Sequence, residues 1–395
     1  MKKFDTIVVG GGAAGIVAAI SAARRGRTVA ICEKMPGLGR KILASGNGRC
    51  NLLNEKLDES FYNAAARGLV KGVFSKFGKK DIERFFEGLG LKLYRDETGR
   101  IFPATNQSAS VLRALELELE RQKAHIEFGF DVTSLSVSGN GFVVKAKNGK
   151  EIVSDSVVMA CGGKSYPAFG SDGTAYRFAR QFGHSVIEPV PYCVGLTVKD
   201  ILCHLLQGQK ISARVSAFSD GNLISEASGE LLFTKYGLSG TAVLDLGEEV
   251  SVAMNRRRRN VRLEVDMVPF IEKAALEREL GARIAKDMKN EDLLVGILPN
   301  KFGNALRDIL KQRHAAGAAA LLKARRFDVI GTRGWNEAEF TAGGVSVDEV
   351  SGATLESKLR KGLFFAGEML DVNGQRGGYN LAWAWSSGFV AGFGA

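Results

Sequence analysis

A glycine-rich turn close to the N-terminus restricts the possible folds of this chain more than any other feature. Gly10, Gly12 and Gly15 have the G-x-G-x-x-G spacing, and they lie between a β-branched run at Phe4–Val9 and the alanine-rich segment Ala13–Arg25. In a β-α-β unit the first glycine forms a tight turn, the second lets backbone approach a pyrophosphate, and the third lets the helix lie close to the sheet. The N–H groups at the helix start then face the phosphates. This context predicts a dinucleotide-binding unit.

Glu33 is the acidic partner that the glycine turn requires. It ends the second strand expected in this unit, Thr28–Glu33. A carboxylate at that position can accept hydrogen bonds from both hydroxyls of an adenosine ribose. The unit is therefore expected to bind a cofactor that contains adenosine, although it does not by itself distinguish NAD from FAD.

The far end of the chain favours FAD. An apolar strand is expected at Gly362–Ala366, Glu368 follows it, and the glycine pair Gly377-Gly378 precedes a helix that continues from Leu381. The carboxylate can bind a ribityl hydroxyl, and the helix start can approach the flavin N1–C2=O edge, which becomes negative on reduction. The alternative is an ordinary strand–turn–helix with a surface glutamate. We expect one FAD site assembled from both ends of the chain.

A second glycine-rich segment, residues 37–51, follows the ribose-binding strand. It contains Arg40, Lys41 and Arg49, any of which can lie near phosphate or flavin, or else be solvated on a surface loop. Cys50 is either a reactive thiol near the flavin or, as is more usual, a small buried hydrophobe. Val132 is expected either to contact adenine through its backbone or to pack in the core.

The predicted cofactor-binding residues come from several separate stretches. They are Gly10, Gly12, Ala14, Gly15, Glu33, Lys34, Arg40, Lys41, Ser45, Gly46, Asn47, Arg49, Cys50, Asn51, Val132, Ala160, Gly162, Gly163, Gly367, Glu368, Gly377, Gly378, Tyr379, Asn380 and Leu381. No catalytic acid or base can be named from the sequence. The four histidines and five cysteines have no metal-like spacing, so no metal site is expected.

The pattern of apolar and polar residues along the chain predicts an α/β fold with an insertion. Residues 1–188 and 330–395 are expected to form a Rossmann-type FAD-binding domain, with helices at Lys79–Gly88 and Ser108–Lys123. Short alternating segments predict an inserted β-barrel over 189–268, and a small helical subdomain is expected over 269–329. Its helices are expected at Glu272–Lys286, Glu291–Leu298, Gly303–Arg313 and Ala316–Arg325.

Charge and cysteine content limit the setting in which the protein works. The net charge of +11 suits either a solvated basic surface or a nucleic-acid partner, and without a basic helix interleaved with aromatics we expect no nucleic-acid partner. Arg256–Arg259 is read as a solvated hairpin turn between two strands, with a phosphate-binding patch as the alternative. Scattered cysteines and the absence of a long apolar run favour a cytoplasmic protein that is not in a membrane.

Five segments of the chain resemble the BaiN-like or YhiN-like FAD-dependent oxidoreductases, which include bile-acid-reductase-like and aminoacetone-oxidase-like flavoproteins. The segments are Val8–Glu33, Gly37–Asn54 with its Ser-Gly-Asn-Gly-Arg-Cys-Asn core, Ala160–Tyr176, Phe340–Lys358 and Gly362–Gly392. The resemblance implies bound FAD and a Rossmann-type core interrupted by a β-barrel and a small helical unit.

The expected function is two-electron oxidation or reduction of a small organic substrate, with hydride passing to or from the flavin. Only one glycine fingerprint is present, so NAD(P)H is expected to act as a transient donor that docks over the flavin rather than as a stably bound cofactor. The resemblance inclines toward a reductase. The alternatives are an oxygen-using amine oxidase that releases peroxide, a flavoenzyme acting on tRNA, and an FAD-binding module without turnover.

Overall fold

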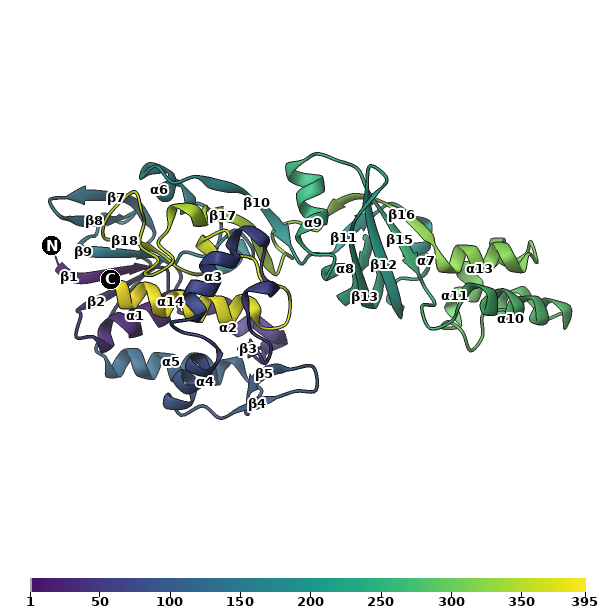
Figure 1. Ribbon diagram of the computed structural model, residues 1–395, viewed down its shortest axis with the longest axis horizontal. Coiled ribbons are helices and arrows are strands. Elements are labelled where there is room, and N and C mark those ends of the chain that lie inside the picture. The colour runs from purple at the N-terminus through teal and green to yellow at the C-terminus, as the bar shows by residue number, and fades with distance from the viewer. Residues whose placement is uncertain (1) are drawn as a thin grey trace. The chain divides into compact units, whose positions relative to one another are not determined.

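The structure, a computed structural model, describes residues 2–395, and its chain divides into two units (Figure 1). The first contains the residues up to Pro189 together with Phe340–Ala395, and the second is Val190–Glu339. The chain returns to the first unit at Phe340 rather than at residue 330, because the last barrel strand, β16, extends over Arg325–Thr332 in the second unit. The α/β fold with an inserted barrel is confirmed.

A mixed seven-stranded sheet built from both ends of the chain forms the centre of the first unit. Its parallel strands lie in the order β6 (His125–Phe128), β2 (Val29–Glu33), β1 (Lys2–Val9), β9 (Glu151–Met159) and β18 (Leu363–Phe365). The antiparallel strands β8 (Gly141–Ala146) and β7 (Val132–Ser138) continue it beyond β9. β18 pairs only with the last part of β9, with Phe365 opposite Met159, while β8 pairs antiparallel with the first part. The C-terminal strand therefore completes the sheet at the end where β1 runs into the glycine turn.

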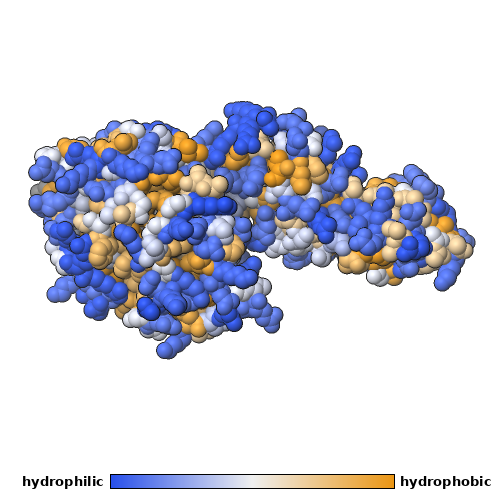
Figure 2. Space-filling view, viewed as in Figure 1, coloured by the Kyte–Doolittle hydropathy of each residue, from blue (hydrophilic) through white to orange (hydrophobic). Residues whose placement is uncertain are grey.

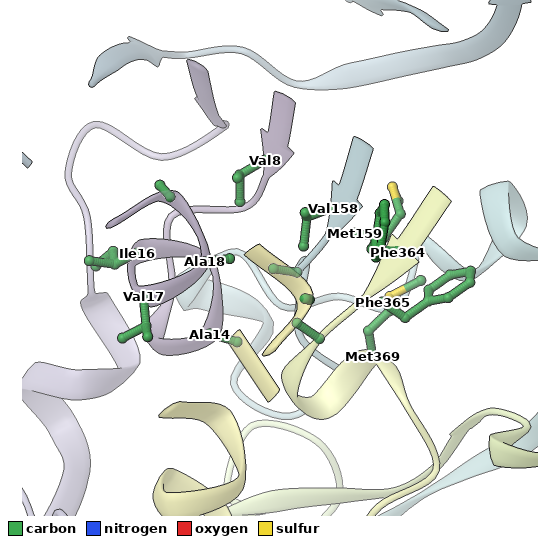
Figure 3. Close-up of a cluster of buried hydrophobic side chains, with 14 of the residues drawn as sticks. Val8, Ala14, Ile16, Val17, Ala18, Val158, Met159, Phe364, Phe365 and Met369 are labelled. Atoms are coloured by element: carbon green, nitrogen blue, oxygen red, sulfur yellow. The ribbon is translucent and has the colours of Figure 1, made fainter. Parts of the chain in front are cut away.

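One helix from each end of the chain packs beside this sheet. Methyl groups at Gly388 and Gly392 of α14 (Tyr379–Gly394) would lie 2.3 Å and 2.1 Å from the carbonyl oxygens of Ala14 and Ala18 in α1 (Ala13–Arg24). Only glycine permits so close an approach of two helix backbones. Side chains of α1, β1, β9 and β18 gather in one apolar cluster (Figure 3), so the two ends of the chain share a core.

The remaining elements of the first unit surround this core. They are α1 (Ala13–Arg24), α2 (Arg40–Ala44), β3 (Leu53–Asn54), α3 (Arg67–Phe74), α4 (Lys79–Gly88), β4 (Leu93–Arg95), β5 (Arg100–Pro103), α5 (Ser108–Arg121), β7 (Val132–Ser138), β8 (Gly141–Ala146), α6 (Tyr176–Gln181), β10 (Val186–Tyr192) and β17 (Phe340–Val345). The helices predicted at Lys79–Gly88 and Ser108–Lys123 are confirmed.

The second unit is a closed antiparallel barrel with small helices, and its strand order is β11-β14-β13-β12-β15-β16. The strands are β11 (Leu196–Val198), β12 (Lys210–Ser219), β13 (Asn222–Thr234), β14 (Gly237–Ser239), β15 (Val261–Asp266) and β16. The helices are α7 (Ile201–Leu205), α8 (Thr241–Leu244), α9 (Glu248–Ser251), α10 (Lys273–Ala285), α11 (Lys301–Ala305), α12 (Arg307–Leu310) and α13 (Ala315–Lys323).

Three expectations for the second unit were wrong. The helix predicted at Glu291–Leu298 is a single 3₁₀ turn followed by loop, because Gly296 takes the left-handed conformation at φ 79°. The helix predicted at Gly303–Arg313 breaks at Leu306 into α11 and α12. Arg256–Arg259 does not turn between two strands, since a π-helical segment, Val252–Arg256, precedes it.

Glu118 on α5 is a nearly buried carboxylate that is expected to stabilise the first unit. Its 6% exposed side chain forms ion pairs with Arg121 at 2.7 Å and with Arg24 of α1 at 2.8 Å. Hydrogen bonds from Arg121, then Arg24 and Gln122, lower the pKa of this carboxyl from 4.5 to about 2 against the opposing effect of burial. The carboxylate therefore stabilises the fold above about pH 4.5, and this contribution disappears as pH falls toward about 2.

Glu118→Gln is expected to lower the free energy of unfolding at neutral pH by about 1–3 kcal/mol and to weaken its pH dependence below pH 4.5. Urea denaturation at several pH values measures both effects. Glu120→Gln is the matched control, because the Glu120 side chain on the same helix is 60% exposed. Equal losses in the two variants would contradict this account.

Candidate cofactor-binding site

The glycine turn between β1 and α1 has the geometry that the fingerprint requires. Gly10 has φ 103°, and a methyl group there would lie 2.5 Å from the carbonyl oxygen of Ala160 at the end of β9. A methyl group at Gly15 would lie 1.9 Å from the carbonyl oxygen of Gly10. Gly12 differs, because a methyl group there would meet no atom within 4 Å. The first and third glycines are thus required by the protein itself, whereas the second leaves open space beside the start of α1.

Glu33 lies next to this turn and is partly buried. Its carboxylate oxygens accept hydrogen bonds from the backbone N–H groups of Gly11 at 2.6 Å and Met35 at 2.7 Å. Each carboxylate oxygen can accept a further hydrogen bond, so both remain available to a ribose. Phe130 donates its N–H to the backbone oxygen of Glu33 at 3.0 Å, which brings Val132, two residues later, to the same end of the sheet. The carbonyl oxygen of Val132 already accepts a hydrogen bond from Arg177 at 3.1 Å.

Lys41 and Glu368 join the two ends of the chain. The Lys41 ammonium contacts a Glu368 carboxylate oxygen and the Ser165 hydroxyl, both at 2.7 Å, and that hydroxyl donates to Glu368 at 3.0 Å. Glu368 also accepts from the N–H groups of Thr341 at 2.6 Å and Gly163 at 3.4 Å. Four protein donors therefore surround a carboxylate that we expected to be free for a ribityl hydroxyl. Lys41, whose ammonium has a third hydrogen to donate, is the less occupied of the two groups.

Ser165 and Thr341 were missed by the sequence reasoning. The Thr341 hydroxyl accepts hydrogen bonds from the N–H groups of Lys164 at 2.8 Å and Ser165 at 3.0 Å, and so fixes the loop after β9. A methyl group at Gly163 would lie 2.3 Å from the same hydroxyl oxygen, so this predicted site glycine is needed for packing within the protein. Thr341 belongs to the Phe-Thr-Ala-Gly-Gly-Val segment, which was the only sequence signal for it.

The start of α14 packs against the loop that follows α2. Gly377 and Gly378 have φ of 123° and 106°, and a methyl group at Gly378 would lie 2.6 Å from the carbonyl carbon of Leu53 and 2.9 Å from the side-chain oxygen of Asn51. Asn54, also missed, donates to the carbonyl oxygen of Gly377 at 3.0 Å. The structure therefore brings together the predicted stretches around residues 51 and 377–381.

The basic residues in the second glycine-rich segment, and Lys34 just before it, contact different partners. Arg40 lies over the Phe169 ring, 5.7 Å from its centroid, and Arg49 over the Phe102 ring at 4.7 Å. Lys34 forms an ion pair with Asp172 at 2.8 Å. Among these cations only Lys41 contacts a residue from the C-terminal stretch of the prediction.

The loop around Asn47 is exposed and has an unusual backbone. Gly46, Asn47 and Gly48 have φ of 57°, 55° and 82°, a left-handed run that costs free energy at the asparagine. Cys50, which follows it, is fully buried, and burial raises the pKa of its thiol to about 12. A thiol in that state is not a nucleophile at neutral pH, so the buried, inert reading of Cys50 is the one that the structure supports.

The N-termini of α1 and α14 are suited to binding an anionic cofactor that contains a flavin. Neither α1 nor α14 has an acidic residue in its first turn or a side chain that caps it, so their first N–H groups lack a cap of their own. Together with the open space at Gly12 and the carboxylate of Glu33, these features fit FAD. We propose that the α1 start and Gly12 hold the pyrophosphate, Glu33 the adenosine ribose, and the α14 start the flavin ring.

Within residues 2–395 there is no group of three or more His, Cys, Asp or Glu side chains placed to hold a metal ion. The helices of the same residues include none that is long and apolar enough to cross a membrane.

The fold and the relatives of this chain define an FAD-dependent oxidoreductase. The chain belongs to the family described as HI0933-like protein Rossmann domain, which it matches over residues 4–394. It is 38% identical to the 3-dehydro-bile acid delta(4,6)-reductase of Clostridium scindens, over 98% of this chain and 97% of that protein. It is 31% identical to the ribosomal RNA dihydrouridine synthase of Escherichia coli, over 99% of this chain and 97% of that one.

Solved structures share the fold. The 3-ketosteroid delta1-dehydrogenase of Sterolibacterium denitrificans superposes with a TM-score of 0.55 at 14% identity, and each chain covers 99% of the other. A flavocytochrome c3 fumarate reductase gives a TM-score of 0.50 at 17% identity, over 100% of this chain and 78% of that one. At such identities the likeness concerns the fold alone.

Proposed function

We propose that this protein reduces a carbon–carbon double bond conjugated to a carbonyl group, with NAD(P)H as the transient electron donor. The observation that carries the proposal is the full-length similarity to two kinds of enzyme whose names share one reaction type. A delta(4,6)-reductase of a 3-dehydro steroid and a dihydrouridine synthase both saturate a double bond next to a carbonyl-bearing ring position. The small-molecule substrate is the first candidate because the reductase is the more similar of the two relatives.

The chain's own residues supply binding, orientation and charge for this chemistry. Bound FAD supplies hydride transfer through its N5 atom. Overall, NAD(P)H provides the hydride, which reaches the carbon β to the carbonyl, while a proton from solvent or a side chain reaches the α carbon. The uncapped start of α14 can stabilise the negative charge of the reduced ring. Lys41 is paired with Glu368 and can donate its third hydrogen to the cofactor.

The second unit lacks a β-α-β dinucleotide fold in its described residues. The strand pairs of the barrel are antiparallel, whereas a dinucleotide fold of the β-α-β type needs parallel strands. Within the described part of Val190–Glu339 there is no counterpart of the Gly10–Gly15 turn. The single glycine fingerprint at residues 10–15 therefore supports NAD(P)H as a transient co-substrate that dissociates before the substrate binds.

Anaerobic stopped-flow mixing with NADPH and with NADH tests this function. We expect the oxidised flavin absorbance to bleach within about a second at millimolar donor. A second mixing step with a 4-en-3-one steroid or 2-cyclohexen-1-one should then restore it. Reduction of the flavin by a small amine but by neither nucleotide, with peroxide formed in air, would overturn the proposal in favour of an amine oxidase.

A uracil base in RNA is a second candidate substrate, and a specific observation favours it. The Escherichia coli relative and a second one from Haemophilus influenzae, 28% identical over 98% of this chain, are both named ribosomal RNA dihydrouridine synthases. The C5=C6 bond of uridine is conjugated to the C4 carbonyl, so the reacting group is of the same type. These relatives, with the net charge of +11, weigh against our expectation that no nucleic acid is involved.

A further inference from the structure

Four consecutive arginines, Arg256–Arg259, follow the π-helical segment in the second unit. The backbone closes this segment with hydrogen bonds from Arg257 N–H to the Val252 carbonyl at 3.0 Å and from Arg259 N–H to the Ala253 carbonyl at 2.9 Å. Arg258 takes the left-handed conformation at φ 54°, so the chain reverses within the run. Arg257, Arg258 and Arg259 are exposed and cannot all point in one direction along a regular helix.

The run is poorly neutralised in comparison with the rest of its unit. On the outer face of β15 and β16, cross-strand ion pairs neutralise Arg262 at 3.1 Å and Arg326 at 3.3 Å. Within the run, Arg256 contacts Glu248 at 3.7 Å and Arg259 contacts Asp220 at 3.5 Å, so the exposed charges without a carboxylate partner are those of the two middle arginines. Arg257 and Arg258 take part in none of the ion pairs formed among residues 2–395.

Exposed apolar side chains lie beside the run. Val261, two residues after it, pairs with Val329, and the next residue on β16, Ile330, is 61% exposed. Asp220, the partner of Arg259, is in the β12–β13 turn close to Leu223, which is 57% exposed. Figure 2 shows hydrophobic surface next to a strongly hydrophilic region over α9 and the segment after it.

The arginines follow the C-terminus of the helical segment formed by α9 and Val252–Arg256, and this position explains only part of the clustering of positive charge. Cations near the last turn interact favourably with the unpaired carbonyl groups, and Glu248 at the start of α9 has the complementary charge. That effect decays within one turn, so it does not require two further exposed arginines without carboxylate partners. Guanidinium groups bind phosphates through paired N–H groups, and apolar side chains beside them offer contact to bases.

We propose that Arg256–Arg259, together with Leu223 and Ile330, forms a surface that docks RNA through its phosphates. This inference rests on the second form of the proposed function, in which the reduced double bond belongs to a uracil of the bound RNA. The arginines contact the strand backbone and hold it, while the reaction takes place at the flavin. They are binding residues and take no part in hydride transfer.

The FAD-loaded, full-length protein and its R257Q/R258Q variant are compared with R278Q/K289Q as the matched control. Arg278 and Lys289 are also exposed in the second unit, so both variants lose two positive charges. The probes are a labelled 30-nucleotide uridine-containing RNA and deproteinised bacterial ribosomal RNA, titrated at several salt concentrations. We expect at least a tenfold loss of affinity in R257Q/R258Q, with the slope of log K against log salt smaller by about 1–1.5, and less than a threefold loss in the control.

Equal losses of RNA affinity in the two variants would overturn the proposal, as would a lower melting temperature in R257Q/R258Q with unchanged RNA affinity. Vesicles containing phosphatidylglycerol are the second probe, and arginine-dependent binding to them without RNA binding would also overturn it. Bleaching of the flavin by NAD(P)H and reduction of a free enone should be the same in all three proteins. A wild-type protein that binds RNA through the run but reduces no conjugated double bond would contradict the proposed function and not the docking surface.

Discussion

Replacing Gly12 with alanine is expected to weaken FAD binding by roughly 10- to 100-fold while leaving the protein folded. The added methyl group meets no protein atom within 4 Å, and the backbone of Gly12, with φ −84°, is one that alanine adopts without strain. The open space beside it is where we place the pyrophosphate, so the methyl group would displace phosphate from the N–H groups of α1. Crowding of one methyl group into a filled site costs about 1–3 kcal/mol.

Ultrafiltration of the purified variant followed by titration with FAD measures this loss. Gly68→Ala is the control, because a methyl group at Gly68 in α3 also meets no atom within 4 Å and lies outside the proposed site. Both variants should unfold at temperatures close to that of the unchanged protein. Retention of FAD by Gly12→Ala at the original affinity would mean that the pyrophosphate does not lie at the start of α1.

The Lys41–Glu368 pair is expected to give the second large effect. Lys41→Met leaves the 20% exposed carboxylate of Glu368 without its cation, and we expect about 2 kcal/mol less stability and at least a tenfold loss of FAD affinity. Glu368→Gln should have a similar effect, since it leaves the ammonium without its carboxylate.

A double-mutant cycle separates the pair from the general effects of each change. Because each single change already breaks the contact, K41M/E368Q should be less destabilised than the sum of the two, by about 1–3 kcal/mol. Thermal and urea unfolding measure the coupling. Strict additivity would show that the two groups do not stabilise each other, and an unchanged FAD affinity in all three variants would place the cofactor away from them.

The sequence was sufficient for features that depend on neighbouring residues. The glycine turn at residues 10–15 needs only local backbone chemistry and the strand before it, and Glu33 was placed by its position at the end of the next strand. The helix at Lys79–Gly88 was predicted to the residue because its apolar side chains recur at helical spacing. The change to short alternating segments after residue 188 predicted the insertion, and Glu368 with the Gly377-Gly378 pair predicted that both chain ends bind FAD; the resemblance agreed with both predictions.

Features that depend on contacts distant in the sequence were not predictable. Ser165 and Thr341 matter because β9 and β17 bring them to Glu368, and no local pattern distinguishes them from other surface hydroxyls. The hydrogen bonds that occupy the Glu368 carboxylate were not predictable for the same reason. In the second unit, the short helix before Arg256 was mistaken for a strand, because its alternation of buried and exposed residues extends over too few positions to separate the two periods.

The return of the chain at Phe340 to complete the first sheet has a consequence for synthesis on the ribosome. The N-terminal part up to Pro189 is synthesised about 175 residues before β18 is complete and about 205 residues before α14 is complete. At roughly 5–20 residues per second this is a delay of about 9–40 s. During that time the edge of β9 that pairs with β18 has no partner, and neither has the face of α1 that Gly388 and Gly392 contact in the folded protein. FAD would accordingly bind only after β18 and α14 have been synthesised, and until then the unpaired edge of β9 and the apolar face of α1 are where a nascent-chain chaperone would act.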